Sequence, residues 1–221
     1  MSSLERAVLL LAAVSLTTAS AAGAQAGIGA RASTLGVGAE LSYRVNRTIG
    51  VRGGFNWLEF TRDATLEGVP YDLTPRFESG TLLLDLYPMG GSLHLTGGLL
   101  INGNEGRMSA RLDGPVTING QTYDPSEINS ITGRVSFRRT APYVGLGIAG
   151  SGRIGILFDL GVAISGHPRV AFASDHNLTG PEQTAFEANL QAEQDEVQAD
   201  LDSRDYLRFH PVLSLGIRFR L

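Results

Sequence analysis

The chain ends on HPVLSLGIRFRL, residues 210–221, and this stretch decides the fold class. In an extended strand, successive side chains point to opposite faces. One face of this segment is then wholly apolar, with Leu213, Leu215, Ile217, Phe219 and Leu221. The other face is mostly small or cationic, with Val212, Ser214, Gly216, Arg218 and Arg220. A strand of this kind suits a closed barrel in lipid, where one face meets acyl chains and the other a polar interior.

The same alternation recurs seven more times along the chain. The predicted strands cover residues 28–33, 37–45, 49–57, 81–87, 93–102, 143–149, 154–165 and 210–221. An even number of strands is typical of bacterial single-chain barrels. The sequence therefore predicts an all-β fold, an eight-stranded antiparallel transmembrane β-barrel, as one domain over residues 27–221.

Composition excludes several classes of function. The chain has 221 residues, 43% of them hydrophobic, and a net charge of −4, so it lacks the basic field of a nucleic-acid-binding protein. It has no cysteine, which rules out disulfides and thiolate metal sites. Its four histidines show no helical metal-ligand spacing. We therefore expect no metal, no cofactor and no nucleic-acid partner.

The first 26 residues are typical of a secretory signal peptide. Arg6 precedes an apolar run over residues 7–16, and Ala24-Gln25-Ala26 forms an A-x-A cleavage site before Gly27. The alternative, a membrane anchor, is disfavoured because the run is shorter than the ~20 residues needed to span a bilayer. The pattern predicts export through the periplasm.

Connection lengths indicate which end of the barrel faces out. The turns that follow residues 45, 87 and 149 are short, whereas the connections that follow residues 57, 102 and 165 are long. Short periplasmic turns and long external loops are the rule for outer-membrane barrels. We expect the long connections to be polar loops, the second with an Asn119-Gly120 type I′ hairpin.

The last long connection carries one helical pattern. Pro181 suits the first turn, and an apolar stripe recurs at helical spacing through Phe186, Leu190, Val197 and Leu201. We expect this stripe to pack over the barrel mouth, with the acidic face in solvent. A lid, a partner surface and divalent-ion bridging to lipopolysaccharide remain the functional alternatives.

The chain resembles the small eight-stranded outer-membrane barrel proteins, a class that includes OmpA-, OmpX- and OmpW-like domains. The resemblance covers residues 27–221 and includes the ending Ser214-x-Gly216-x-x-Phe219-x-Leu221. This ending looks like the insertion signal read by the outer-membrane assembly machinery, except that Leu221 stands where the family usually has an aromatic residue. The resemblance implies an outer-membrane location, contact with lipid and lipopolysaccharide, and a monomer as the favoured state.

The predicted interior is polar. The residues assigned to its polar network are Arg31, Glu40, Arg44, Arg52, Asp85, His94, Tyr143, Asp159, Arg218 and Arg220. The lumen of an eight-stranded barrel is about filled by side chains, so these charges must pair. We interpret them as a packed polar network and not as the wall of a wide channel.

Turn lengths predict the register of this network. A two-residue turn at Thr34-Leu35 sets Glu40 opposite Gly29, and the next turn sets Arg52 opposite Ser42. The later turns are expected to set Asp85 opposite His94, and Tyr143 opposite Asp159.

Two groups of residues are candidate catalytic sites. His94 with Asp85 and Ser92 lacks the G-x-S-x-G elbow of many serine hydrolases. His167, Asp175 and His176 form a conceivable loop cluster. Neither assembles a site by the usual geometric criteria. The sequence favours a non-enzymatic outer-membrane barrel that acts structurally or through its external loops. A conduit for small or hydrophobic compounds, as OmpW-like resemblance implies, is the alternative, and a lipid-modifying enzyme is the second.

Overall fold

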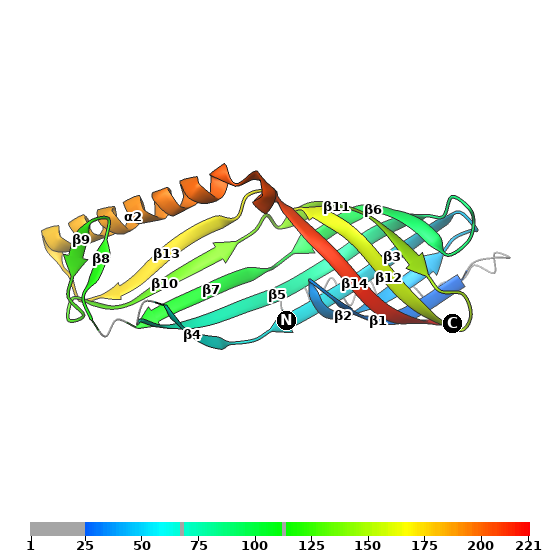
Figure 1. Cartoon of the computed structure of the whole chain (residues 1–221), viewed down its shortest axis with the longest axis horizontal. Helices are drawn as coiled ribbons and strands as arrows, with labels where there is room; N and C mark the ends of the chain where they lie inside the picture. Colours follow the sequence, from blue (N-terminus) through cyan, green and yellow to red (C-terminus); the bar gives the residue numbers. More distant parts are fainter. Residues whose placement is uncertain (1–24, 67–68, 112–113) are drawn as a thin grey trace.

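The computed structural model describes residues 25–66, 69–111 and 114–221 (Figure 1). Eight antiparallel strands close a barrel, because β14 pairs with β1 and β5 pairs with both β3 and β6. The barrel strands are β1 (Gln25–Ser33), β2 (Gly36–Arg44), β3 (Ile49–Glu59), β5 (Val69–Leu86), β6 (Leu93–Asn102), β11 (Thr140–Ala149), β12 (Ile154–Ile164) and β14 (Phe209–Arg220). The predicted fold class is confirmed.

Alternation along each strand places leucines on the outer surface and fills the lumen with their neighbours. Leu84 is 56% exposed, whereas adjacent Leu83 is 4% exposed. In the terminal strand, Leu213 is 48% exposed and Val212 only 2%. Closure pairs the backbone of every barrel strand on both sides, which is what a sheet needs if it is to sit in hydrocarbon.

Most of the predicted signal peptide lies outside the described residues. Strand β1 begins at Gln25, which pairs with Arg44, and Ala26 pairs with Tyr43. The backbone N–H of Leu221 also donates to the carbonyl of Ala26 at 2.9 Å. Two residues before the predicted cleavage point therefore belong to β1, and the cleavage itself stays a prediction. No helix in the described part of the chain is long and apolar enough to cross a membrane.

One end of the barrel continues into a second sheet. Strand β5 has 18 residues, about twice the 9–11 that a spanning strand needs. Its first half pairs with β4 (Arg62–Leu66) on one side and with β7 (Glu105–Arg111) on the other. Beyond β7 follow β10 (Ile128–Ser136) and β13 (Arg169–His176). We use the name extension for residues 69–78 of β5, strands β4, β7, β10 and β13, and the hairpin and helix that cover them. The opposite end of the barrel is called the turn end.

The extension corrects the prediction of polar loops. Apolar positions in β7 and β10, such as Met108 and Val135, alternate with arginine, serine and threonine, so these segments resemble loops in composition. Their pairing with β5 and with each other has no local signature in the sequence. Figure 1 shows the extension continuing from one end of the barrel along the long axis of the molecule, away from the C-terminus.

The predicted hairpin and helix are both present at the tip of the extension. Strands β8 (Val116–Ile118) and β9 (Gln121–Tyr123) are joined by Asn119 and Gly120, with φ angles of 47° and 76°. Positive φ at both central residues matches the predicted type I′ turn. Helix α2 (Gly180–Ser203) has Pro181 in its first turn, and a short 3-10 helix, η2 (Asp205–Arg208), joins it to β14.

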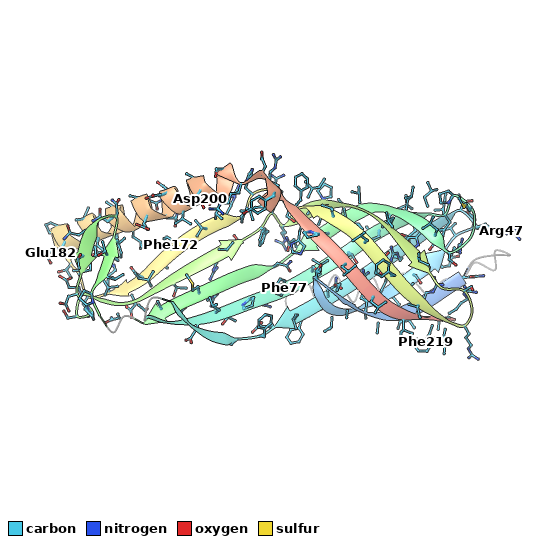
Figure 2. All side chains as sticks on the ribbon, in the orientation of Figure 1. Arg47, Phe77, Phe172, Glu182, Asp200 and Phe219 are labelled. Atoms are coloured by element: carbon cyan, nitrogen blue, oxygen red, sulfur yellow. The ribbon has the colours of Figure 1, made fainter. Side chains whose placement is uncertain are left out.

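Helix α2 does not pack over the barrel mouth, so that prediction is wrong. Phe186 is fully buried against Tyr123, Ile118 and Ile128, at the tip of the extension. Phe186 and Leu190 of the stripe pack against the predicted hairpin and against Ile128 of β10, a strand in a segment that was predicted to be a loop. Figure 2 shows α2, with Glu182 and Asp200, at the opposite end of the molecule from Arg47 and Phe219.

The helix also covers the β13 edge of the extension. The side-chain oxygens of Gln194 and Gln198 accept hydrogen bonds from the backbone N–H groups of Phe172 and Val170, at 2.8 and 3.0 Å. An exposed strand edge is a template for unwanted pairing, and natural proteins cover such edges. The α2 glutamines therefore occupy the place that another strand would take beside β13.

Candidate functional site: the barrel interior and its two ends

Arg52 lies at the centre of the lumen and joins three strands. Its side chain is 4% exposed. The guanidinium lies 2.6 Å from Asp85 of β5, 2.9 Å from Asp159 of β12 and 3.5 Å from Glu40 of β2. An isolated charge here would be very costly to bury, and three carboxylates offset that cost.

A second arginine completes the bridge across the barrel. Arg31 donates to Glu40 at 2.5 Å and to the hydroxyl of Ser214 at 3.1 Å. Glu40 therefore sits between Arg31 and Arg52. The predicted register at both flanking turns is the one observed: Glu40 lies opposite Gly29, and Arg52 opposite Ser42. Ser214 was assigned to the inward face, but not to the polar network.

The predicted pairing of Asp85 with His94 is wrong in register. Asp85 lies opposite Thr96, whose hydroxyl donates to the carboxylate at 2.7 Å. His94 still reaches the same cluster, because its Nε2 lies 3.1 Å from Asp159. The connection between β5 and β6 is longer than a tight turn, since the last pair is Leu86 with Leu95. Thr96 is thus a member of the network that turn counting missed.

The predicted pairing of Tyr143 with Asp159 is also wrong. Tyr143 lies opposite Ala163, and Asp159 lies opposite Gly147. The pairing ends at Ala149 with Leu157, so the β11–β12 connection is wider than the three residues counted. A Cβ added at Gly147 would lie 2.5 Å from the Asp159 carboxylate and 2.6 Å from His94. Glycine at this position therefore makes room for the charged layer.

An apolar layer lies between the charged network and the extension. Its buried members are Leu35, Leu83, Leu100, Ala141, Tyr143, Ala163 and Val212. Leu100 is 1% exposed and Leu35 is 2% exposed. Leu35 belongs to the connection between β1 and β2, which sequence reasoning treated only as a turn. A leucine in a two-residue turn was the one available signal that the turn folds inward.

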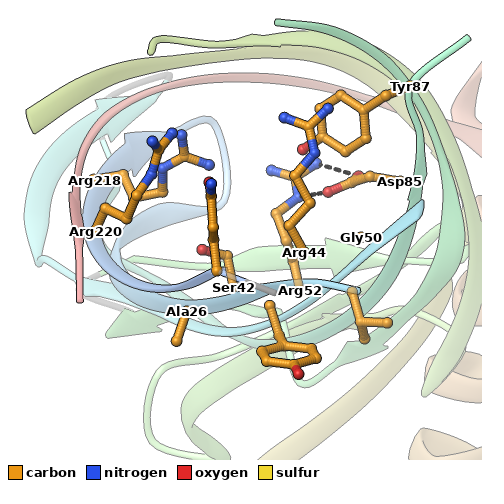
Figure 3. Close-up of a pocket in the computed structure, with 12 residues that line it drawn as sticks. Ala26, Ser42, Arg44, Gly50, Arg52, Asp85, Tyr87, Arg218 and Arg220 are labelled. Carbon is orange, nitrogen blue, oxygen red and sulfur yellow. Dashed lines mark hydrogen bonds and ion pairs between the residues drawn. The ribbon is translucent and has the colours of Figure 1, made fainter. Parts of the chain in front are cut away.

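Cations line the turn end of the lumen (Figure 3). The guanidinium of Arg44 lies 3.8 Å above the ring of Tyr87 and donates to the carbonyls of Gly90 and Gly91. Arg218 donates to the carbonyl of Gly150, and Arg220 lies beside it. The space among them is about 10 Å³, the size of one water molecule. These arginines brace the turns of the barrel.

The structure does not assemble either catalytic constellation. Ser92 contacts His94 only through its backbone carbonyl, at 3.4 Å. His167 lies 3.9 Å from Asp202 before β13 begins, whereas Asp175 and His176 end that strand. Among the residues described, no three His, Asp or Glu side chains gather as a metal site would require.

The terminal motif lies in β14, the strand that pairs with β1 and closes the barrel. Ser214 is buried, and a Cβ added at Gly216 would lie 2.6 Å from the carbonyl oxygen of Ala30, so the strands approach closely there. Phe219 and Leu221 are exposed on the outer surface, at 48% and 83%. Recognition of this ending by an assembly machinery stays a prediction.

Comparison with known proteins supports the fold. No protein-family model matches the sequence, and no curated protein matches it significantly. The crystal structure of CarO2 from Acinetobacter baumannii matches with a TM-score of 0.60 and 23% identity, over 89% of this chain and 98% of that one. CarO from the same organism matches with a TM-score of 0.58 and 22% identity, over 88% and 97% of the two chains. The chain therefore shares the fold of small outer-membrane barrels.

Proposed function

We propose that this protein is a non-enzymatic outer-membrane barrel whose lumen is closed, and whose work is done by the extension on the cell surface. The observation that carries the proposal is the filling of the lumen at three successive levels. Arginines and Tyr87 occupy the turn end, the Arg31–Arg52 network occupies the middle, and an apolar layer occupies the extension end.

The outer surface supports a place in a membrane. Large apolar side chains face outward on every barrel strand, among them Leu84, Leu146 and Ile156, which are 56%, 46% and 66% exposed. Such a belt is stable only in contact with lipid or another apolar surface. The short turns then face the periplasm, and the extension lies outside the cell.

The extension suits a rigid surface platform. It is continuous with the barrel through β5, its β13 edge is covered by α2, and its tip has its own apolar core around Phe186. A display function needs this rigidity, because a binding surface on ordered strands loses less entropy than one on loose loops.

The first test is a measurement of location and conductance on the exported chain. We expect the chain in the outer-membrane fraction and expect its gel migration to change on heating. In planar bilayers we expect no steady conductance, and in liposomes no uptake of small solutes. Steady opening of the wild-type barrel would contradict the closed lumen.

A variant that lacks residues 181–204 tests the alternative of a conduit. Helix α2 contacts β13 and the hairpin, so its removal leaves the lumen closed under our proposal. Uptake of an apolar probe by the wild type, lowered by this deletion, would instead make the helix part of a transport path. The same deletion should leave heat-modified migration of the barrel unchanged.

A further inference from the structure

The outer face of the extension carries an arginine patch. Arg76, Arg107, Arg134 and Arg169 come from four neighbouring strands, β5, β7, β10 and β13. In the ladder, Arg107 lies directly opposite Arg134. One row closer to the barrel, Arg76 lies opposite Glu105, and Glu105 and Arg169 lie on either side of Ser136. The four side chains therefore gather within two rows of one sheet face.

Arg76 is paired with Glu78 at 2.6 Å and with Glu59 at 3.6 Å, so the excess positive charge of the patch lies at Arg107 and Arg134. Two like charges directly opposite on neighbouring strands destabilise a sheet. Arg107 and Arg134 share a single carboxylate, Glu105, at 3.3 and 3.2 Å. Their side chains are each 50% exposed, so both guanidiniums keep donors directed at solvent. An anion that bridges the two arginines would relieve the repulsion.

The patch lies directly beyond the apolar belt and faces the same way. Residues of equal parity in β5 share a face, so Arg76 points to the same side as Leu82 and Leu84. Trp57, which is 48% exposed, is paired with Glu78 at the edge of the belt. Aromatic residues of this kind mark the interface of a membrane with water. Arg76 is only two residues past that row, about 7 Å along the strand.

A hollow adjoins the patch where β6, β7 and β10 meet the rim of the barrel. Its volume is about 270 Å³, and its lining includes Glu105, Ser136 and Arg139. Glu105 belongs both to the hollow and to the arginine patch. The geometry thus combines forked cationic donors with a recess at the level where the headgroups of a bilayer begin.

We propose that the arginine patch binds the phosphate groups of lipid A in the outer leaflet. This inference rests on the proposed location of the barrel in the outer membrane. Planar guanidinium groups donate two parallel hydrogen bonds to a phosphate, and Arg is favoured over Lys for that reason. Acyl chains of the same lipid would lie against the leucines below the patch, so one molecule contacts both surfaces.

The test measures stabilisation of the full exported chain by lipid A in detergent micelles. The readout is the temperature at which the heat-modified gel band converts. We expect lipid A with both phosphates to raise this temperature, and lipid A stripped of phosphate to raise it less. A ligand that binds only the folded state raises its melting temperature. In the variant Arg107→Gln with Arg134→Gln, the two forms of lipid A should therefore raise the conversion temperature by nearly the same amount.

A matched control removes two arginines from the turn end. Arg47→Gln with Arg153→Gln lowers the net charge equally, and both side chains are exposed. This variant should keep the full lipid A effect. Equal loss in both double variants would overturn the proposal, as would an equal shift with inorganic phosphate, which would indicate a site for free anions. If the double variant at the patch does not fold, each single variant should lose part of the difference, and a full effect in both would contradict the site.

Failure of this inference can be told apart from failure of the proposed function. A chain that fractionates with the outer membrane and stays closed, but ignores lipid A phosphates, contradicts only the patch. A chain absent from the outer membrane contradicts the proposed location, whatever its response to lipid A in micelles.

Discussion

Strand β5 passes through two regions in which the same face has opposite polarity. In the barrel, its outer face carries Leu82, Leu84 and Leu86, and its inner face carries buried Ser79 and Asp85. In the extension, the outer face carries Arg76 and Thr74, and the inner face carries Leu73 and Phe77. No irregularity interrupts the ladder with β3 from Arg76 to Leu86.

This inversion shows that the surroundings of a strand, and not its pairing, set which face is apolar. At the membrane location that we propose, lipid covers the outside of the barrel, so charge goes inward and must be paired there. Beyond the lipid, water covers the outside, so arginine returns to the outer face. Loss of one partner of an ion pair should therefore cost more stability in the lumen than in the extension, because burial removes the screening that weakens exposed pairs.

The largest expected contrast is between Arg52 and Arg134. Arg52→Ala leaves Asp85, Asp159 and Glu40 with one arginine between them, and we expect a loss of about 3–5 kcal/mol in the free energy of unfolding. Arg134→Ala removes a half-exposed partner of Glu105 and should change stability by about 0–1 kcal/mol. Urea unfolding in micelles measures both. Similar losses in the two variants would show that the network in the lumen is not the stronger one.

A charge placed on the outer face of β5 sharpens the contrast with smaller effects. Leu84→Arg puts a cation on the lipid-facing belt, for which we expect a cost of roughly 2–4 kcal/mol near the bilayer midplane. Thr74→Glu places a charge on the same face of the same strand in the extension, opposite Arg107, and should cost close to zero. Folding yield into liposomes at increasing urea compares them. Equal tolerance at the two positions would place the membrane boundary elsewhere.

Two glycines test how tightly the lumen is packed. Gly147→Ala places a methyl group against Asp159 and His94, and we expect it to cost about 1–3 kcal/mol as an overpacked interior site. Gly97→Ala is the control, since Gly97 faces outward and a Cβ there meets nothing within 4 Å. Melting of the heat-modified band ranks the two variants. A stable Gly147→Ala barrel would mean that the charged layer is loosely packed.

The smallest effect is expected at the edge of the extension. Gln194→Ala with Gln198→Ala removes acceptors from the amides of Phe172 and Val170, at about 1 kcal/mol for each hydrogen bond. Hydrogen exchange should accelerate at those two amides and not in the barrel. Gln191→Ala, whose side chain bonds only to Asp195 within the helix, is the control. Unchanged exchange in the double variant would show that the helix does not protect the edge of β13.

Periodicity determined the barrel from the sequence alone. Two-residue alternation places Leu213, Leu215 and Ile217 on one face whatever the partner strand is, and lipid is the environment that such a face needs. Register followed from turn length only where the turn was tight, as at Thr34-Leu35. There, the turn leaves one pairing possible, and Glu40 falls opposite Gly29.

Tertiary structure alone decided the rest. The wider connections after Leu86 and Ala149 allow several registers, and packing of Thr96 and Gly147 against the charged layer selects one. The strands of the extension pair over long separations that leave no local pattern, and the same alternation is compatible with either face being covered. Leu35 and Phe186 are buried only because distant strands meet around them. The sequence by itself determined which residues alternate, and the assembled sheet decided what each face touches.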